Sequence, residues 1–297
     1  MAATRQILLR RNAAQNICRI TKTMEMISTA KFKSYHNLWQ SISDYHNALA
    51  RAGYLLATTD SALEHPLLKE NSSGRGAVLA IGTTRGLCGS YNSEIFRLVT
   101  VHIKSAKAMG KKLDIYTHQC RLLPMLSHYG VAPKKVYSEL DELPSYMQIE
   151  GIADDFIAEY QKGELDNLAI VYMRYYSASS QLAQTLMIMP LTDLIADLAT
   201  RATAIWPWNL ASEDFHFSPP LNKVVESLAR MIISSWIGAC FMDAALSEHF
   251  SRMVAMRNAT ENAEDMIKDL TTEYNRARQT QITSELLDII GGIGEQA

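Results

Sequence analysis

The segment IGTTRGLCGSYN (81–92) has a composition that could suit phosphate binding. It follows GAVLAIG (76–82), a short apolar run typical of a buried strand. Phosphate-binding loops place glycines between a strand and a helix, because backbone N–H groups at the start of a helix bind anions. The spacing of Gly82, Gly86 and Gly89, however, matches neither GxGxxG nor GxxxxGKS/T. We therefore favour a tight structural turn over a nucleotide site.

Cys88 is a candidate nucleophile, because the start of a helix can stabilise a thiolate. It would need a histidine partner, and no motif places His102 or His118 beside it. The other histidines show no HExxH motif or paired-ligand spacing. The cysteines lack a CxxC pair, which indicates free thiols in a reducing compartment. We therefore expect no catalytic residue, no cofactor and no metal site.

The composition is that of an ordinary globular protein, with 47% hydrophobic and 20% charged residues in 297 positions. This length suffices for one large or two medium domains. The net charge of -2 does not favour nucleic-acid binding by the whole chain. No run of about 18 apolar residues is present, so we expect no membrane span. Arg10, Arg11, Arg19 and Lys22 break any export signal, although an amphipathic transit peptide is harder to exclude.

Glycine and proline are absent from two long terminal stretches. The first glycine is Gly53, and after Pro220 only Gly238 interrupts the chain before Gly291. Because these two residue types are the strongest helix breakers, both stretches are predicted to be very long helices. A compact domain of this size cannot bury helices of such length, so they must pack on each other or on other chains.

Apolar residues in the C-terminal stretch repeat in alternating steps of three and four, which predicts a coiled-coil seam. The seam comprises Met253, Met256, Thr260, Ala263, Ile267, Leu270, Tyr274 and Ala277. Beyond Ala277 the register is lost, because Gln281 and Ser284 take the next seam positions. In the N-terminal stretch the same spacing predicts a seam of Ile17, Ile20, Met24 and Ile27.

The two ends carry opposite charge. Residues 1–33 hold seven Lys or Arg and one acid, whereas residues 261–297 hold three basic and eight acidic residues. This charge favours antiparallel and parallel pairing alike. The basic N-terminal face could bind nucleic-acid phosphates or a membrane surface, but its narrow apolar seam favours a protein partner.

The middle of the chain alternates strands and helices, which predicts a small, largely parallel α/β sheet. The predicted strands are 76–82, 112–118, 134–140, 168–173 and 184–191. The predicted helices are 93–109, 121–128 and 149–161. Residues 206–220 read as a connector into the C-terminal helix.

Three segments together resemble the gamma subunit of F-type ATP synthases: residues 11–33, 83–92 and 247–292. They occur in the family's order, and the family's length covers essentially the whole chain. One departure is Thr84, where the family commonly has aspartate. The chain also lacks the cysteine-bearing insertion of chloroplast-type members.

The resemblance implies an α/β fold with a long antiparallel coiled coil of N- and C-terminal helices and an inserted Rossmann-like α/β domain. The expected domains are a coiled-coil helix over 1–60, the Rossmann-like domain over 75–215, and a coiled-coil helix over 219–297. The implied role is a non-catalytic central-stalk rotor that couples proton transport to ATP synthesis. Its expected partners are the alpha and beta subunits, an epsilon-type subunit and the c-subunit ring, with no nucleic acid.

Membrane association would be indirect, through the c ring, on the cytoplasmic side of a bacterial inner membrane. By resemblance, the expected partner-contact residues are Met24, Arg252, Arg278, Gln279, Thr283 and Glu285. Gly86, Cys88 and Gly89 are expected to be structural. Each of the six partner-contact residues could instead be ordinary helix surface. An enzyme built on the central domain, or a coiled-coil adaptor without rotary function, are the alternative hypotheses.

Overall fold

The computed structural model describes residues 2–57, 66–177, 180–192, 194, 218 and 221–294. Its elements are α1 (Ala2–Ala57), the 3-10 helix η2 (Pro66–Leu68), β1 (Arg75–Ala80), α2 (Tyr91–Ala108), β2 (Lys112–His118), α3 (Leu122–His128), β3 (Lys135–Tyr137), α4 (Tyr146–Gln161), β4 (Asn167–Ser177), β5 (Ser180–Met189) and α6 (Leu221–Gly294). Contacts divide the chain into two compact units. Unit 1 comprises Met1–Ala30 and Arg252–Ala297, and unit 2 comprises Lys31–Ser251.

Unit 2 is built around a five-stranded sheet in the order β3-β2-β1-β4-β5. The strands β3, β2, β1 and β4 pair in parallel, and β5 pairs antiparallel to β4. The prediction of a largely parallel α/β sheet is therefore confirmed. The strand predicted at 134–140 is present but shorter, since β3 covers only Lys135–Tyr137.

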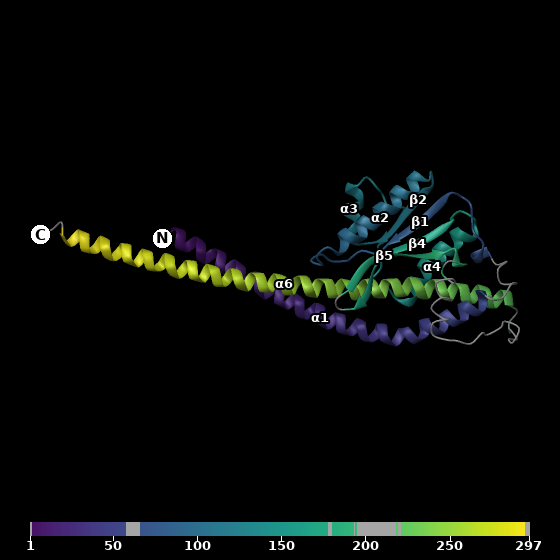
Figure 1. Ribbon diagram of the computed structural model, residues 1–297, viewed down its shortest axis with the longest axis horizontal. Coiled ribbons are helices and arrows are strands. Elements are labelled where there is room, and N and C mark those ends of the chain that lie inside the picture. The colour runs from purple at the N-terminus through teal and green to yellow at the C-terminus, as the bar shows by residue number, and fades with distance from the viewer. Residues whose placement is uncertain are drawn as a thin grey trace. The chain divides into compact units, whose positions relative to one another are not determined.

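Helices cover both faces of this sheet, as Figure 1 shows. Alternate residues of β1 point to opposite faces, so Ala77 and Leu79 join one core while Val78 and Ala80 join the other. The first core is completed by α4 and the N-terminal part of α6, and the second by α2 and α3. Two buried layers explain why the central strands read as continuous apolar runs.

The start of α4 is fixed by a capping box. The Ser145 side chain accepts a hydrogen bond from the Gln148 backbone, and the Gln148 side chain accepts one from the Ser145 backbone. This arrangement satisfies two of the donors that a helix start leaves unpaired. The helix consequently begins at Tyr146, three residues before the predicted start.

Unit 1 is an antiparallel helix pair, formed by the first part of α1 and the last part of α6 (Figure 1). Its direction follows from three contacts: Thr4 bonds to Gln281, Arg11 lies over the Tyr274 ring, and Thr260 bonds to Thr21. The predicted fold class is confirmed. The predicted α6 seam is also confirmed, since none of its eight residues is exposed. 

The predicted seam of α1 is wrong. Ile17, Ile20, Met24 and Ile27 are 53%, 58%, 36% and 55% exposed. The buried residues of this segment are Ala14, Thr21 and Ser28, which are seven positions apart and at most 8% exposed. Small side chains let the two helices approach closely, whereas the larger residues lie on a neighbouring face. The helical period was correct, but the apolar residues marked the wrong side of the helix.

By length and composition alone, one stretch of α6 within Lys223–Ser284 could cross a membrane. No such stretch was predicted from the sequence. Core helices of proteins that cross no membrane meet the same criterion. Ile232, Ile233 and Ile237 of α6 are fully buried in the core of unit 2. Packing in that core therefore accounts for apolar residues of α6. The predicted connector 206–220 lies outside the described residues, apart from Ser218.

Candidate functional site

The glycine-containing loop between β1 and α2 is a closed turn. Asn92 accepts a hydrogen bond from the Thr83 backbone at 3.0 Å and donates one to the Thr83 hydroxyl at 2.7 Å. Gly89 has a φ of 60°, a left-handed conformation that favours glycine. A Cβ at Gly82 would lie 2.6 Å from the Leu122 side chain, so close packing requires glycine there. Packing therefore explains Gly82 and backbone geometry explains Gly89, whereas neither explains Gly86.

Cys88 is buried in this loop, at 4% exposure. Its Sγ lies within hydrogen-bond distance of the carbonyls of Arg85 and Gly86, at 3.2 and 3.3 Å. The two histidines considered as partners have other contacts, His102 with Thr185 and His118 with the Gly82 carbonyl. Burial lowers the pKa of His118 and of His102. The arrangement supports a structural role for the thiol.

Thr84 contacts the long helix α6. Its backbone N–H donates to Glu248 Oε2 at 3.3 Å, and its hydroxyl lies 3.5 Å from Oε1. Glu248 is only 4% exposed, so these donors help to satisfy a buried carboxylate. Thr84 therefore makes a polar contact with α6, in which the threonine is the donor.

Glu142 joins the segment before α4 to both long helices. Its Oε2 lies 2.5 Å from Lys31 Nζ of α1 and 3.3 Å from His249 Nε2 of α6. These two partners, His249 first, lower the pKa of Glu142 to about 2 against the opposing effect of burial. Nearby, burial and the charges of Glu142 and Glu248 raise the pKa of Tyr35. One carboxylate thus fixes three segments of unit 2 together.

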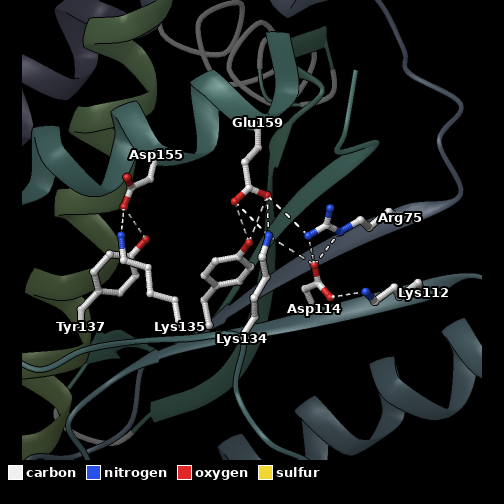
Figure 2. A network of polar contacts seen from close by, with 9 residues as sticks. Arg75, Lys112, Asp114, Lys134, Lys135, Tyr137, Asp155 and Glu159 are labelled. Carbon is white, nitrogen blue, oxygen red and sulfur yellow. Dashed lines mark hydrogen bonds and ion pairs between the residues drawn. The ribbon is translucent and has the colours of Figure 1, made fainter. Parts of the chain in front are cut away.

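A second polar network lies where β1 and β2 begin (Figure 2). The buried Asp114 carboxylate lies 2.5 Å from Arg75, 3.5 Å from Lys134 and 3.8 Å from Lys112. Lys134 also lies 2.9 Å from Glu159 of α4. The hydrogen bond with Asp114 raises the pKa of Arg75. Because opposite charges alternate in this network, it stabilises the end of the sheet at which β1 and β2 begin.

A separate group of polar side chains at β3 joins Lys135, Tyr137 and Asp155.

The predicted partner-contact residues all belong to unit 1, but they differ in exposure. Arg278, Gln279 and Thr283 are exposed on α6, and the Thr283 hydroxyl donates to the Gln279 carbonyl at 2.9 Å. Met24 is 36% exposed, whereas Arg252 is buried at 6%. The Glu285 side chain lies outside the described residues.

Sequence reasoning missed the exposed apolar surface of unit 1. Ile17, Ile20, Met24 and Ile27 form an apolar stripe along one face of α1, with spacings of three and four residues. Near the end of α6, Ile282, Leu286 and Leu287 are 44%, 54% and 63% exposed. Contiguous apolar surface of this kind marks interaction sites. In α1 the signal was visible in the sequence but was assigned to the seam, and the apolar residues near the end of α6 were not singled out.

The described residues hold no group of three or more His, Cys, Asp or Glu side chains that could bind a metal. The same residues present an antiparallel helix pair, an exposed apolar stripe, and an α/β unit with paired charges.

Comparison with known proteins gives one consistent result. The family model described as ATP synthase matches residues 3–294. The ATP synthase gamma chain of Rhodopirellula baltica is 33% identical over 99% of this chain and 98% of its own length. That of Leptospira biflexa is 30% identical over 98% of both chains.

Solved structures share the fold. A chain in the structure of the Euglena gracilis mitochondrial ATP synthase described as OSCP/F1/c-ring, rotational state 3, aligns with a TM-score of 0.64 at 18% identity. The alignment covers 99% of this chain and 95% of that one. A chain from the rotor of the same enzyme in rotational state 1 gives a TM-score of 0.59 at 16% identity, with 95% and 99% coverage. Full-length sequence identity and the matching fold lead to one conclusion: the chain belongs to the ATP synthase gamma chain family.

Proposed function

We propose that this chain is the non-catalytic central-stalk rotor of an ATP synthase, which couples proton flow across a membrane to ATP synthesis. The gamma chain names of its full-length relatives support this role. Structural neighbours come from assemblies described as F1/c-ring and rotor. The rotor would work by presenting different faces of its helix pair to catalytic sites on other chains, which is a coupling free energy between distant sites.

The exposed apolar stripe of α1 is the observation that carries this proposal. In the part of the chain that the structure describes, four large apolar side chains on one face of a two-helix coil are 36–58% exposed. A surrounding assembly of alpha and beta subunits would cover them, with Met24 as a contact residue. Arg252 is buried, so we propose that it stabilises the helix pair.

The last part of α6 would reach deepest into the hexamer. Thr4, close to the start of α1, pairs with Gln281, whereas α6 continues to Gly294. Arg278, Gln279, Thr283 and Glu285 would contact the inner loops of the hexamer there. The exposed Ile282, Leu286 and Leu287 would add an apolar bearing surface beside these polar groups.

Different segments of the chain would form different parts of the rotor. Residues 1–60 and 219–297 would form the shaft, and the α/β domain within 75–215 would form its base, with Gly86, Cys88 and Gly89 as structural residues. The base would contact the c ring and an epsilon-type subunit. In this proposal the chain would lie on the cytoplasmic side of a bacterial inner membrane, attached through the c ring, and would need no cofactor and no catalytic residue of its own.

Co-expression with the alpha and beta subunits of the same source tests the proposal. We expect a stable hexamer that contains one copy of this chain. Ile20→Lys should weaken its incorporation, whereas Gln15→Lys, an exposed site on another side of α1, should not. Hexamers that form without this chain would contradict the proposal. ATP binding by the isolated full-length chain in calorimetry would instead support an enzyme built on the α/β domain.

A further inference from the structure

Unit 2 contains a cavity of about 650 Å³, lined by α1, the segment before α4, α4 itself, β4 and α6. Its volume falls within the range of small-molecule sites. Six of the lining side chains are large aromatics: Trp39, Tyr45, Tyr146, Tyr175, Tyr176 and Trp236. His46 stacks on Trp236 with ring centroids 5.5 Å apart. Aromatic walls of this kind suit a flat or flexible apolar body.

The cavity also holds polar groups in need of a partner. Ser234 is 3% exposed and lines the cavity, yet its Oγ has no hydrogen-bond partner in the described part of the chain. The Oγ of the neighbouring Ser235, which also lines the cavity, is buried without a partner as well. A buried hydroxyl without a hydrogen-bond partner destabilises the folded state. Two such hydroxyls at one wall indicate a ligand that carries hydrogen-bond acceptors.

Two charged residues face the same space. Arg174 of β4 lies with its guanidinium 4.9 Å from the centre of the Tyr176 ring. Asp243 of α6 accepts a hydrogen bond from Trp39 Nε1 at 2.9 Å. Burial raises the pKa of Asp243 to about 7, against the lowering effects of Trp39 and Arg174. Near neutral pH this carboxyl is therefore about half protonated, while the guanidinium stays charged.

We propose that this cavity binds an apolar monocarboxylate, such as a medium-chain fatty acid. The carboxylate pairs with Arg174 and accepts hydrogen bonds from the serine hydroxyls, and the apolar body lies along the aromatic rings. Guanidinium and carboxylate groups form strong charge-assisted hydrogen bonds.

The opposite choice, a cationic amphiphile, is disfavoured by the charge balance. Aromatic rings and the Asp243 carboxylate would attract a cation, but Arg174 in the same lining repels it. Burial lowers the pKa of His46, which also lines the cavity, so this residue is uncharged near neutral pH. Trp39 of α1 and Arg174 of β4 lower the pKa of Asp243. The charge of Asp243 in turn contributes to the raised pKa values of Tyr91 of α2, Tyr172 of β4 and Cys240 of α6.

Binding should depend on pH through Asp243. A ligand carboxylate is repelled by ionised Asp243 and can accept a hydrogen bond from the protonated form. Affinity should therefore be highest below pH 7 and fall as pH rises through the Asp243 pKa of about 7. The steepest possible change is about tenfold per pH unit, because one proton is involved.

Displacement of the fluorescent probe 8-anilinonaphthalene-1-sulfonate from the full-length chain tests the site. Laurate, dodecylamine and dodecanol share a chain length but differ in head-group charge. We expect laurate to displace the probe at the lowest concentration, with at least a fivefold advantage at pH 6.5. Arg174→Gln should abolish that advantage, whereas Arg97→Gln, an exposed site on α2, should preserve it.

Asp243→Asn should keep laurate binding and remove its pH dependence, which separates the ligand site from a folding effect. Thermal unfolding of each variant checks that the fold is intact. Tighter binding of dodecylamine than of laurate would overturn the proposal. Equal binding by the Arg174→Gln and Arg97→Gln variants, or no displacement by laurate, would overturn it as well.

Discussion

Thr260 and Thr21 meet in the buried seam of the helix pair, where the Thr260 hydroxyl donates to the Thr21 hydroxyl at 2.7 Å. Both residues are buried, at 6% and 8% exposure. Thr21 in turn donates to the Cys18 carbonyl at 3.1 Å. This buried polar pair favours the observed register of the coiled coil, because a shifted pairing would lose the bond between the two helices and leave each hydroxyl only a carbonyl of its own helix, Cys18 or Met256.

This pair should behave as a coupled unit in a double-mutant cycle. Thr260→Val leaves the Thr21 hydroxyl with one partner fewer and should destabilise the protein by about 1–2 kcal/mol. Thr21→Val should have a similar effect. The loss of stability in the double variant should be smaller than the sum of the two single losses by about 0.5–1.5 kcal/mol. Urea unfolding of the four proteins measures this coupling, and strictly additive effects would show that the pair does not act as a unit.

The seam of α1 depends on small residues, which a size increase should disrupt. Ala14 is 2% exposed, so Ala14→Leu inserts a large side chain between the helices and should destabilise unit 1 by about 1–3 kcal/mol. Ile17→Ala, on the exposed stripe, should change stability by no more than about 0.5 kcal/mol. Circular dichroism during thermal unfolding compares the two. A larger loss of stability for Ile17→Ala than for Ala14→Leu would indicate that the large apolar residues, and not the small ones, form the seam.

Much of the fold was predictable, because it depends on local signals. The absence of glycine and proline marked both long helices, and strand–helix alternation marked the sheet. The α6 seam was predictable from Met256, Ala263 and Leu270, which are both apolar and buried. The α1 seam was not, because Thr21 and Ser28 carry no hydrophobic signal and pack there owing to their size.

The cavity could not be predicted from local sequence. Trp39, Arg174 and Asp243 come from α1, β4 and α6, so the fold alone brings them together. The Glu142 contacts are similar, because Lys31 and His249 lie more than a hundred positions away on either side. The glycine loop was predictable as a turn, since its spacing excluded the known phosphate motifs.

Glu142 should make stability depend on pH in the acid range. Its pKa is lowered from 4.5 to about 2 in the folded chain. The folded state therefore holds the ionised form more strongly, and this stabilisation is present above about pH 4.5 and lost as pH falls through about 2. Glu142→Gln should be less stable than the parent at pH 7, with a difference that shrinks below about pH 3.

Urea unfolding across this pH range checks the expectation, with Asp141→Asn as the control, because Asp141 is an exposed neighbour. A difference between Glu142→Gln and the parent that stays constant from pH 7 to pH 2 would show that the contacts of the Glu142 carboxylate with Lys31 and His249 are not its cause.

The ratio of proton pumping to ATP hydrolysis in a reconstituted complex tests the rotor function most directly. Met24→Lys adds a charge to the exposed stripe, where we propose that alpha and beta subunits slide past, and Gln15→Lys adds the same charge elsewhere on α1. We predict that Met24→Lys lowers proton pumping severalfold more than ATP hydrolysis, with thermal stability unchanged, and that Gln15→Lys leaves the ratio at its parent value. Pumping and hydrolysis that fall in equal proportion in the Met24→Lys complex would contradict the account.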